Sequence, residues 1–184
     1  MKKTSVNERI LQTASRLFYQ QGYNSTGINQ IVAEAEIAIG SLYKHYRSKE
    51  ELLIRYLELE ETAFFKGLAE YLEAVQSPGE KLMKLIDYRI ALQQRSGFAG
   101  CPFIKINAEG GRLNKQVAEL VTRHKQQQKT TIKNILLERT GKKRDADLAA
   151  AAIFLLIEGA VVSSSMNGNT DDLQAVKKIV PTLV

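Results

Sequence analysis

The sequence of 184 residues predicts an all-α protein. Apolar residues recur three and four positions apart along most of the chain, which is the spacing of one helix face. Several helix starts are marked by Ser followed three residues later by Glu, a capping box in which the two side chains satisfy free backbone N–H groups. Clusters of Gly and Asn separate the helical stretches. Because no alternation typical of strands and no internal repeat is present, we expect helices throughout.

The first helix is expected at about residues 6–21. Ser5-x-x-Glu8 forms a capping box at its start, and one apolar stripe runs along it. Gly22 follows as a natural C-terminal stop. This helix is long enough to brace the two shorter helices that come next.

Two short helices follow, separated by a tight turn. Thr26 is expected to cap the first of them. A brief turn around Glu36 leads to the second, at about residues 38–46. Leu42 and Tyr46, four residues apart on this helix, are expected to face the core.

The rest of the chain is expected to be a succession of longer helices. Ser48-x-x-Glu51 starts one that extends to about Val75, and Ser77-Pro78 starts the next with Pro at its first position, where no N–H is needed. The remaining helices are expected near residues 78–96, 102–109, 113–139, 145–166 and 171–180. We therefore divide the chain into a helix-turn-helix domain at residues 1–48 and a helical domain at residues 49–184, connected by the helix at residues 49–75.

The positive charge of the chain gathers near its start. The net charge is +6, and residues 1–49 hold seven Lys or Arg against three Glu. This excess suits a polyanionic partner but does not choose between nucleic acid and an anionic membrane. Lys2 and Lys3 form a basic arm that is either merely solubilising or adds salt-sensitive affinity for DNA.

Other features indicate a cytoplasmic protein without a membrane span or cofactor. One cysteine excludes an intramolecular disulfide framework. The longest apolar run, residues 148–157, is well short of the roughly 20 residues that span a bilayer, and the first residues lack the apolar region of a secretion signal. The sequence shows no metal-ligand cluster and no phosphate-binding Gly loop, so we expect neither metal nor cofactor.

The two short helices and their turn predict a DNA-reading unit. A tight turn between short helices, braced by a longer helix, places the second helix in the major groove. Base edges are read there by polar side chains, and phosphates are held by cations, hydroxyls and helix starts. The second short helix offers Ser41, Tyr43, Lys44 and His45, and Gly40 lets the backbone approach DNA closely.

The stretch GSLYKHYRSKEELL closely resembles the end of the DNA-binding domain of TetR/AcrR-family transcriptional repressors. The resemblance covers Ile10 to about Leu53, including the Gly22-Tyr23 pair and the Gly40-Ser41-Leu42-Tyr43 run. It implies a three-helix DNA-binding domain, a connecting helix and a helical ligand-binding and dimerisation domain. It also implies a homodimer that binds a palindromic double-stranded operator and releases it when a small-molecule inducer binds.

Carried over by position, the resemblance implies a set of DNA contacts. Thr26 is expected to touch a phosphate, and Tyr43 and Lys49 to grip the backbone. Ser41, Lys44 and His45 match the base-facing surface. The complete expected set is Thr26, Asn29, Ile39, Gly40, Ser41, Tyr43, Lys44, His45 and Lys49.

Two positions depart from the family pattern. Glu36 stands where the turn commonly has Gly, and a positive φ there costs Glu roughly 1–2 kcal/mol more. Ile39 replaces a polar residue, so an apolar contact with a thymine methyl takes the place of a polar one. Two assignments also have alternatives: Tyr43 and Tyr46 both suit the core, although we favour DNA for Tyr43, and His45 is either a DNA contact or solvated.

The C-terminal domain is expected to hold a dimer face and a pocket. Small and branched residues form a stripe on the last long helices, which is either the core of a four-helix bundle between two subunits or only intrachain core. This stripe comprises Ile132, Ile135, Leu136, Ala149, Ala152, Ile153, Leu156 and Ala160. Candidate pocket residues, each also suited to ordinary core, are Phe64, Tyr88, Leu92, Phe98 and Phe103.

Cys101 is a candidate sensor. Pro102 looks like a first helical position, so Cys101 lies at a helix start whose dipole favours a thiolate, and Lys105 one turn on is placed to assist. The segment that begins Gly100-Cys101-Pro102 resembles one in a branch of the family in which some members sense quinones, aldehydes and maleimides through the cysteine. The alternative is a small, inert core residue.

Three classes of function were weighed. A ligand-responsive repressor explains the reading helix and the large second domain together. An enzyme that uses Cys101 lacks a partner, because His45 belongs to the DNA segment and His124 lies in a polar run expected to be solvated. A non-specific architectural DNA-binding protein would have little use for a large apolar domain, and equal affinity for unrelated DNA would favour it.

Overall fold

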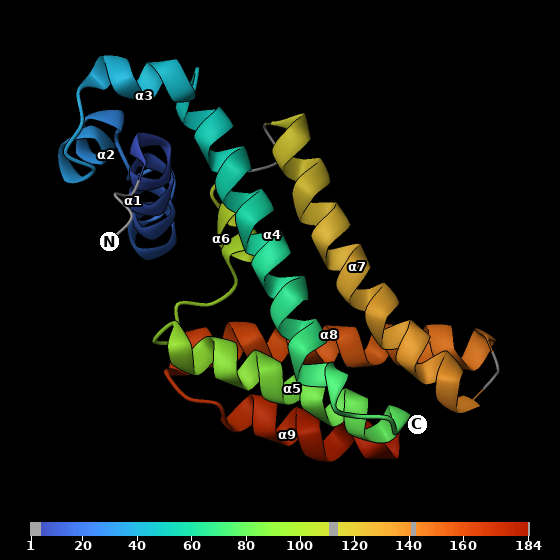
Figure 1. Ribbon diagram of the computed structural model, residues 1–184. Coiled ribbons are helices and arrows are strands. Elements are labelled where there is room, and N and C mark those ends of the chain that lie inside the picture. Colours follow the sequence, from blue (N-terminus) through green and yellow to red (C-terminus); the bar gives the residue numbers. More distant parts are fainter. Residues whose placement is uncertain (1–4, 111–113, 141–142, 184) are drawn as a thin grey trace. The chain divides into compact units, whose positions relative to one another are not determined.

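The computed structural model describes residues 5–110, 114–140 and 143–183, without the side chains of residues 139, 140 and 143. Within these ranges the regular elements are helical and none is a strand (Figure 1). They are α1 Val6–Gln21, α2 Ile28–Glu34, α3 Ile39–His45, α4 Lys49–Glu73, α5 Pro78–Arg95, α6 Pro102–Ala108, α7 Lys115–Thr140, α8 Lys143–Asn167, α9 Asp171–Ile179 and the short 3₁₀ helix η2 Val180–Thr182. The all-α prediction is confirmed, and the expected helix bounds agree with these to within a few residues.

The chain forms two compact units, and each is built from two stretches of sequence. The first unit contains residues 1–62 and 102–121, and the second contains residues 63–101 and 122–184. α4 and α7 therefore each contribute one part to each unit, and α6 belongs to the first unit. Lys2 and Lys3, the expected basic arm, lie outside the described residues.

The first unit has a core built around α1, which packs against α2 and α3. The apolar stripe of α1 (Ile10, Ala14, Leu17 and Phe18) is buried. The Phe18 ring lies between those of Tyr23 and Tyr56, with centroids 5.3 and 5.9 Å away. Leu42 and Tyr46 are buried as predicted. Complete burial stabilises a large apolar side chain by roughly 1.5–3 kcal/mol, so this stripe holds the three helices together.

In the second unit, α5, α8 and α9 lie side by side (Figure 1). α8 carries small buried residues, such as Ala146 and Ala150, that let neighbouring helices approach closely. Lys177 of α9 pairs with Asp87 of α5 at 2.6 Å. By length and composition alone α8 would suffice to cross a membrane, and about a third of its most apolar window is buried inside the chain.

The stripe proposed for dimerisation is mostly intrachain core. Of its residues, Ile132, Ile135, Leu136, Ile153 and Ala160 are buried within the single chain. The exposed apolar residues of α8 lie on another face, at Leu148, Leu155, Val162 and Met166. We call these four residues the α8 outer face. Intrachain core, the second of the two interpretations that the sequence left open, therefore describes these five residues, whereas Ala149, Ala152 and Leu156 are half-buried.

The three expected capping boxes differ in outcome. At Ser5 both hydrogen bonds of the box are present, at 2.8 and 3.2 Å. At Ser48 the hydroxyl accepts the Glu51 N–H at 3.1 Å, but the Glu51 carboxylate accepts from the N–H of Arg47 instead of Ser48. Ser77 makes no side-chain cap, so the start of α5 depends on Pro78 at its first turn.

Candidate nucleic-acid interface and buried pocket

The turn between α2 and α3 is held by one arginine of α1. Glu36 in this turn has a φ of +52°, the left-handed conformation expected where glycine is usual. The Arg9 Nη1 donates to the carbonyl oxygens of Ala35 and Glu36, at 3.1 and 3.3 Å. These carbonyls lie at the end of α2, where a helix leaves acceptors without partners. Arg9 therefore supplies hydrogen bonds to the free carbonyls of the strained turn, and the turn in turn positions the start of α3.

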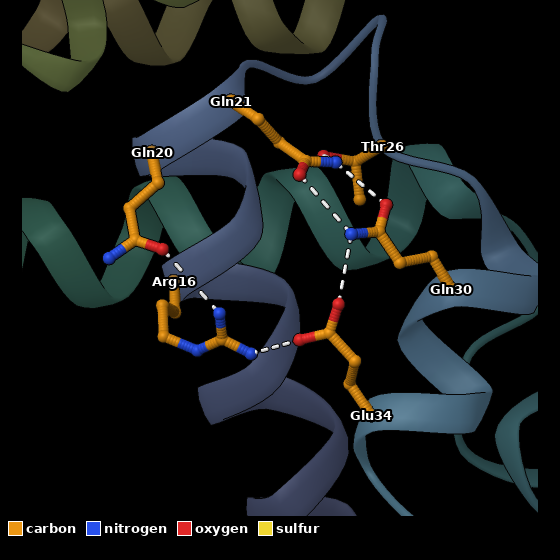
Figure 2. Close-up of polar contacts among 6 residues, drawn as sticks. All are labelled: Arg16, Gln20, Gln21, Thr26, Gln30 and Glu34. Carbon is orange, nitrogen blue, oxygen red and sulfur yellow. Dashed lines mark hydrogen bonds and ion pairs between the residues drawn. The ribbon is translucent and has the colours of Figure 1, made fainter.

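Figure 2 shows a row of polar side chains that joins α1 to α2. Arg16 of α1 pairs with Glu34 of α2, and this hydrogen bond lowers the pKa of the Glu34 carboxyl. Gln30 donates to Glu34 at 2.9 Å and exchanges two hydrogen bonds with Gln21 of α1, at 2.7 and 3.2 Å. Each contact is exposed and individually weak. Together they set how α2 is rotated against α1.

α3 presents a surface of exposed side chains. Ile39 and Tyr43 lie one turn apart on one side, and about half of each is exposed, 48% and 50%. A Cβ added at Gly40 would meet nothing within 4 Å, so the backbone there is open to a partner. The remaining polar residues of α3 are exposed Lys44 and His45 and half-buried Ser41. Asn29 on α2 is exposed as well. We call Ile39, Gly40, Tyr43, Lys44 and His45 the α3 surface.

Thr26 has a structural role that the sequence analysis missed. Its side chain is fully buried, and its hydroxyl donates to the carbonyl of Gly22 at 2.7 Å. α2 is preceded by Gly27 at its N-cap and has no side-chain cap. Both expected roles of the hydroxyl, capping α2 and touching a phosphate, are contradicted because the hydroxyl points into the protein.

Lys49, at the start of α4, ties that helix to the loop before α2. Its Nζ donates to the carbonyl oxygens of Tyr23 and Thr26, at 3.0 Å each, and lies 4.1 Å from the centre of the Tyr23 ring. Burial lowers the pKa of this ammonium. Two of its three N–H donors are thus engaged inside the protein. A phosphate contact through the third stays a prediction.

A second attachment joins α6 to the loop between α1 and α2, within the first unit. The Asn24 N–H donates to the Glu109 carboxylate at 2.8 Å, and the Asn24 side-chain amide donates to the Glu109 carbonyl at 2.9 Å. A Cβ at Gly22 would lie 2.7 Å from the Glu109 carboxylate, so this approach requires glycine. Lys105 of α6 donates to the carbonyl of Tyr19. No spacing in the sequence signals these contacts, because the partners are some 85 residues apart.

The second unit contains a narrow pocket that is almost closed: its cavity of about 10 Å³ has room for about one water molecule. Six lining residues are apolar: Phe64, Leu68, Leu85, Ile132, Phe154 and Ile157. The other two are Arg89 and Gln128, which place polar groups in an otherwise apolar wall. This combination is typical of small-molecule sites, where a few polar groups orient an apolar ligand.

Five buried or half-buried polar side chains form a network behind this pocket. Arg89 donates to the side-chain carbonyl oxygen of Gln128 at 3.0 Å and pairs with Glu158 at 3.1 Å. The other Glu158 oxygen pairs with Lys125 at 2.5 Å. The Gln128 amide nitrogen lies 2.6 Å from Nε2 of His124. No motif or spacing in the sequence indicates this network, because its members come from three helices, α5, α7 and α8.

His124 is neutral in the folded protein. The sequence analysis placed it on a solvated face, which is wrong, because the residue is 1% exposed. Burial, together with the neighbouring Lys125 and Arg89, lowers the pKa of its imidazole to about 3. Since the Gln128 carbonyl accepts from Arg89, the amide nitrogen of Gln128 donates to Nε2 of His124. This pattern requires a ring without a proton on Nε2.

Cys101 lies at the end of the same network. The residue is buried, 8% exposed, as the core alternative requires, whereas a reactive thiol is usually accessible. It directly precedes Pro102, the first residue of α6, as predicted. The expected partner Lys105 is turned away to Tyr19, and Lys125 instead donates to the Cys101 sulfur at 3.3 Å.

The candidate pocket residues do not all lie together. Phe64 lines the pocket. Tyr88 lies outside the lining but donates its hydroxyl to the Phe64 carbonyl at 2.9 Å. Phe103 is buried in α6, in the first unit. Leu92 and Phe98 are half-buried and outside this lining, so for them a ligand contact stays a prediction.

Comparison with known proteins supports a single family. Residues 10–56 match the family described as bacterial regulatory proteins, tetR family, and residues 78–179 match the LmrA/YxaF-like transcriptional regulator C-terminal domain. The chain is 26% identical over 179 residues to the uncharacterized HTH-type transcriptional regulator YxaF of Bacillus subtilis (strain 168), across 96% of this chain and 94% of YxaF. It is 30% identical over 105 residues to the HTH-type transcriptional repressor NemR of Escherichia coli (strain K12), across 55% and 52%. A putative transcriptional regulator from Saccharomonospora viridis in complex with choline has the same fold, with a TM-score of 0.84 and 22% identity over 97% of each chain.

Proposed function

The chain belongs to the TetR family of bacterial regulatory proteins, and from that premise we propose that it is a repressor that binds a palindromic operator as a homodimer and leaves it when a small molecule binds. The observation that carries this proposal is the α3 surface, held by Arg9 and open to solvent. Members of this family are generally not enzymes. They are soluble cytoplasmic regulators, and we place this chain in the same compartment.

α3 is the helix that enters the major groove. Tyr43 and Lys44 supply a phenol and an ammonium for phosphates and base edges. Ile39, at the start of the helix, supplies an apolar contact for a thymine methyl. Asn29, Ser41 and His45 extend the same contact area, and Lys49 adds its third donor.

The α8 outer face is the proposed dimer contact. Leu148, Leu155 and Val162 are spaced by seven residues, and Met166 follows four residues later, so they form one continuous row. Ile179, on the adjoining α9, is exposed too. An exposed apolar row of this length marks an interaction site. A second copy is its occupant, because a palindromic operator requires a two-fold dimer.

Chain continuity connects the second unit to the first, whose helices α1, α2, α3 and α6 we call the reading head. Cys101 ends the first of the two stretches of the second unit, and Pro102 begins α6. Glu109, the residue after α6, holds Asn24. A ligand that moves the Cys101 end of this connection therefore pulls on the loop that precedes α2. Inducer and operator then weaken each other's binding by the same factor.

We further propose that the inducer includes electrophiles that react at Cys101. The Lys125 ammonium donates to the Cys101 sulfur at 3.3 Å, and this sulfur adds as the thiolate to the β-carbon of a quinone or maleimide. The new S–C bond forms as the C=C electron pair moves to the carbonyl, and solvent supplies the proton. Because Cys101 is buried, the reaction requires a local opening. If Cys101→Ser releases operator as readily as wild type on addition of N-ethylmaleimide, the sensor role fails.

The test of the main proposal is selection of bound fragments from genomic DNA. We expect an inverted repeat whose half-site centres are separated by about 10 base pairs or a multiple. Binding measured by fluorescence anisotropy should weaken steeply with salt. Lys44→Gln should lower operator affinity, whereas Lys66→Gln, an exposed lysine of α4 in the second unit, should not. Equal affinity for unrelated DNA would favour an architectural protein instead.

A further inference from the structure

In the part of the chain that the structure describes, the lining of the pocket in the second unit contains a cationic side chain and no carboxylate. Arg89, which is 3% exposed, and Gln128 are the polar residues of the lining. Glu158, the carboxylate that pairs with Arg89, is not part of the lining. A molecule in the pocket therefore contacts the Arg89 guanidinium but not the Glu158 carboxylate.

The charges around this wall do not balance. Arg89 and Lys125 are two cations, and they share the single carboxylate of Glu158. His124, the other titratable group of the network, is neutral near pH 7 because its pKa is held at about 3. The network thus holds one positive charge in excess, in a region where unbalanced charge is costly.

We infer that the pocket binds a small organic anion with an apolar, single-ring body, and that its negative group pairs with Arg89. The pocket is nearly closed in this structure, so its six apolar lining residues must move apart to admit the ring, which they then contact. Phe64, whose ring centre lies 5.4 Å from the Arg89 Cζ, is the lining residue that contacts both the ring and the guanidinium. A carboxylate supplies the missing negative charge. Its role as the inducer rests on the proposed function, whereas binding itself does not.

Arg89 has donors for such a ligand. A guanidinium carries five N–H groups in a planar fork that matches a carboxylate. Among the described residues, Nη1 donates to Gln128 and Nη2 to Glu158. An incoming carboxylate competes with the neutral Gln128 carbonyl for Nη1, and a charged acceptor wins that competition. Glu158 keeps both cations, so the ion pairs survive while the amide of Gln128 is displaced.

The experiment compares carboxylates with their own amides on the protein alone, without DNA. Benzoate, phenylacetate and cinnamate are each titrated beside the matching amide by calorimetry, at constant ionic strength maintained with sodium chloride. We expect at least one carboxylate to bind and its amide to bind about ten to a hundred times more weakly, the ratio for a hydrogen bond to a charged group. Arg95→Gln, an exposed arginine of the same helix, is the control and should bind as wild type does.

Two variants change the charge in opposite directions. Arg89→Gln should reduce carboxylate affinity at least tenfold; it leaves Glu158 paired with Lys125, so the fold is retained. Glu158→Gln should increase affinity for the same carboxylate, because it leaves both cations without their shared partner. Circular dichroism checks that each variant is folded.

The inference is overturned if no carboxylate binds wild type or Glu158→Gln, if an amide binds as tightly as its acid, or if Arg89→Gln binds as wild type does. Its failure differs from failure of the proposed function. Anion binding without any selected operator leaves this site intact and refutes the repressor. A selected operator with no anion binding refutes the site and leaves the repressor.

Discussion

The two units use their buried and half-buried charged side chains in different ways. In the first unit, Arg9, Lys49 and Lys105 donate to backbone carbonyls, and Glu109 accepts a backbone N–H. In the second unit, Arg89, Lys125 and Glu158 bind one another.

A backbone partner is fixed by the fold, so a cation that holds it locks one geometry. A side-chain partner can be exchanged for a ligand group at small cost. We therefore expect the reading head to keep one shape, and the charged network of the second unit to exchange a partner when a ligand binds.

Leu155→Glu should have the largest effect, because it places a charge on the α8 outer face of the second unit. An unpaired charge buried in a symmetric contact costs roughly 3–5 kcal/mol. We expect dimerisation and operator affinity to fall by about a hundredfold or more. Sedimentation and anisotropy measure the two losses. Leu59→Glu, an exposed leucine of α4 in the first unit, is the matched control and should leave the dimer intact.

His124 should make the second unit sensitive to acid. Its pKa is about 3 when folded, against an ordinary 6.5, so the unfolded chain binds more protons between these values. The contribution of His124 to the free energy of unfolding is fully present above pH 6.5. It falls as the pH decreases toward 3, by at most about 1.4 kcal/mol per pH unit. Urea unfolding of wild type and His124→Gln across pH 7 to 4 measures the slope.

The unfolding free energy of His124→Gln should depend less steeply on pH than that of wild type. His45→Gln removes the other histidine, which is exposed on α3, and should change nothing. Equal slopes for wild type and His124→Gln would contradict the buried neutral imidazole.

Arg9→Met should weaken the reading head. It removes a charged donor from two carbonyls of the α2–α3 turn, a loss of roughly 1.5–3 kcal/mol. Operator affinity should fall with it, because the start of α3 is no longer held. Arg16→Met, which removes an exposed ion pair, should cost less than about 1 kcal/mol. Similar losses of stability in the two variants would show that the backbone contacts of Arg9 contribute no more than an exposed ion pair does.

Glu36→Gly should have the smallest effect and the opposite sign. The left-handed conformation at this position is strained for Glu and free for Gly. We expect a gain of about 1 kcal/mol in unfolding free energy, read as a higher melting temperature. Glu34→Gly, two residues earlier inside α2, is the opposite control and should be destabilising. A melting temperature that falls for Glu36→Gly would show that another contact of Glu36 outweighs the strain.

Local features of the fold were predictable from the sequence. Capping residues and apolar spacing gave the helix bounds, because both act within one or two turns. Apolar spacing also placed Tyr46 in the core, whereas the exposure of Tyr43 and the positive φ at Glu36 were suggested by the family pattern.

Contacts between distant segments were not predictable. Thr26 was expected to cap α2, but its hydroxyl donates to the Gly22 carbonyl and accepts from no N–H of α2. Lys105 was expected to contact Cys101 because the two residues are close in the sequence, whereas Lys125 of α7 makes that contact. Spacing shows which residues share a helix face but not which other helix that face meets. The pocket wall at Arg89 was missed for the same reason.

The attachment of Asn24 to Glu109 limits how such a protein can be rearranged. Residues 1–62 do not make a whole reading head, since α6 supplies part of it from beyond α5. A head exchanged between relatives by recombination at the end of α3 would carry Asn24 and leave Glu109 behind. Asn24, Gly22 and Glu109 are therefore expected to change together over evolutionary time, as one inherited set divided between two distant parts of the gene.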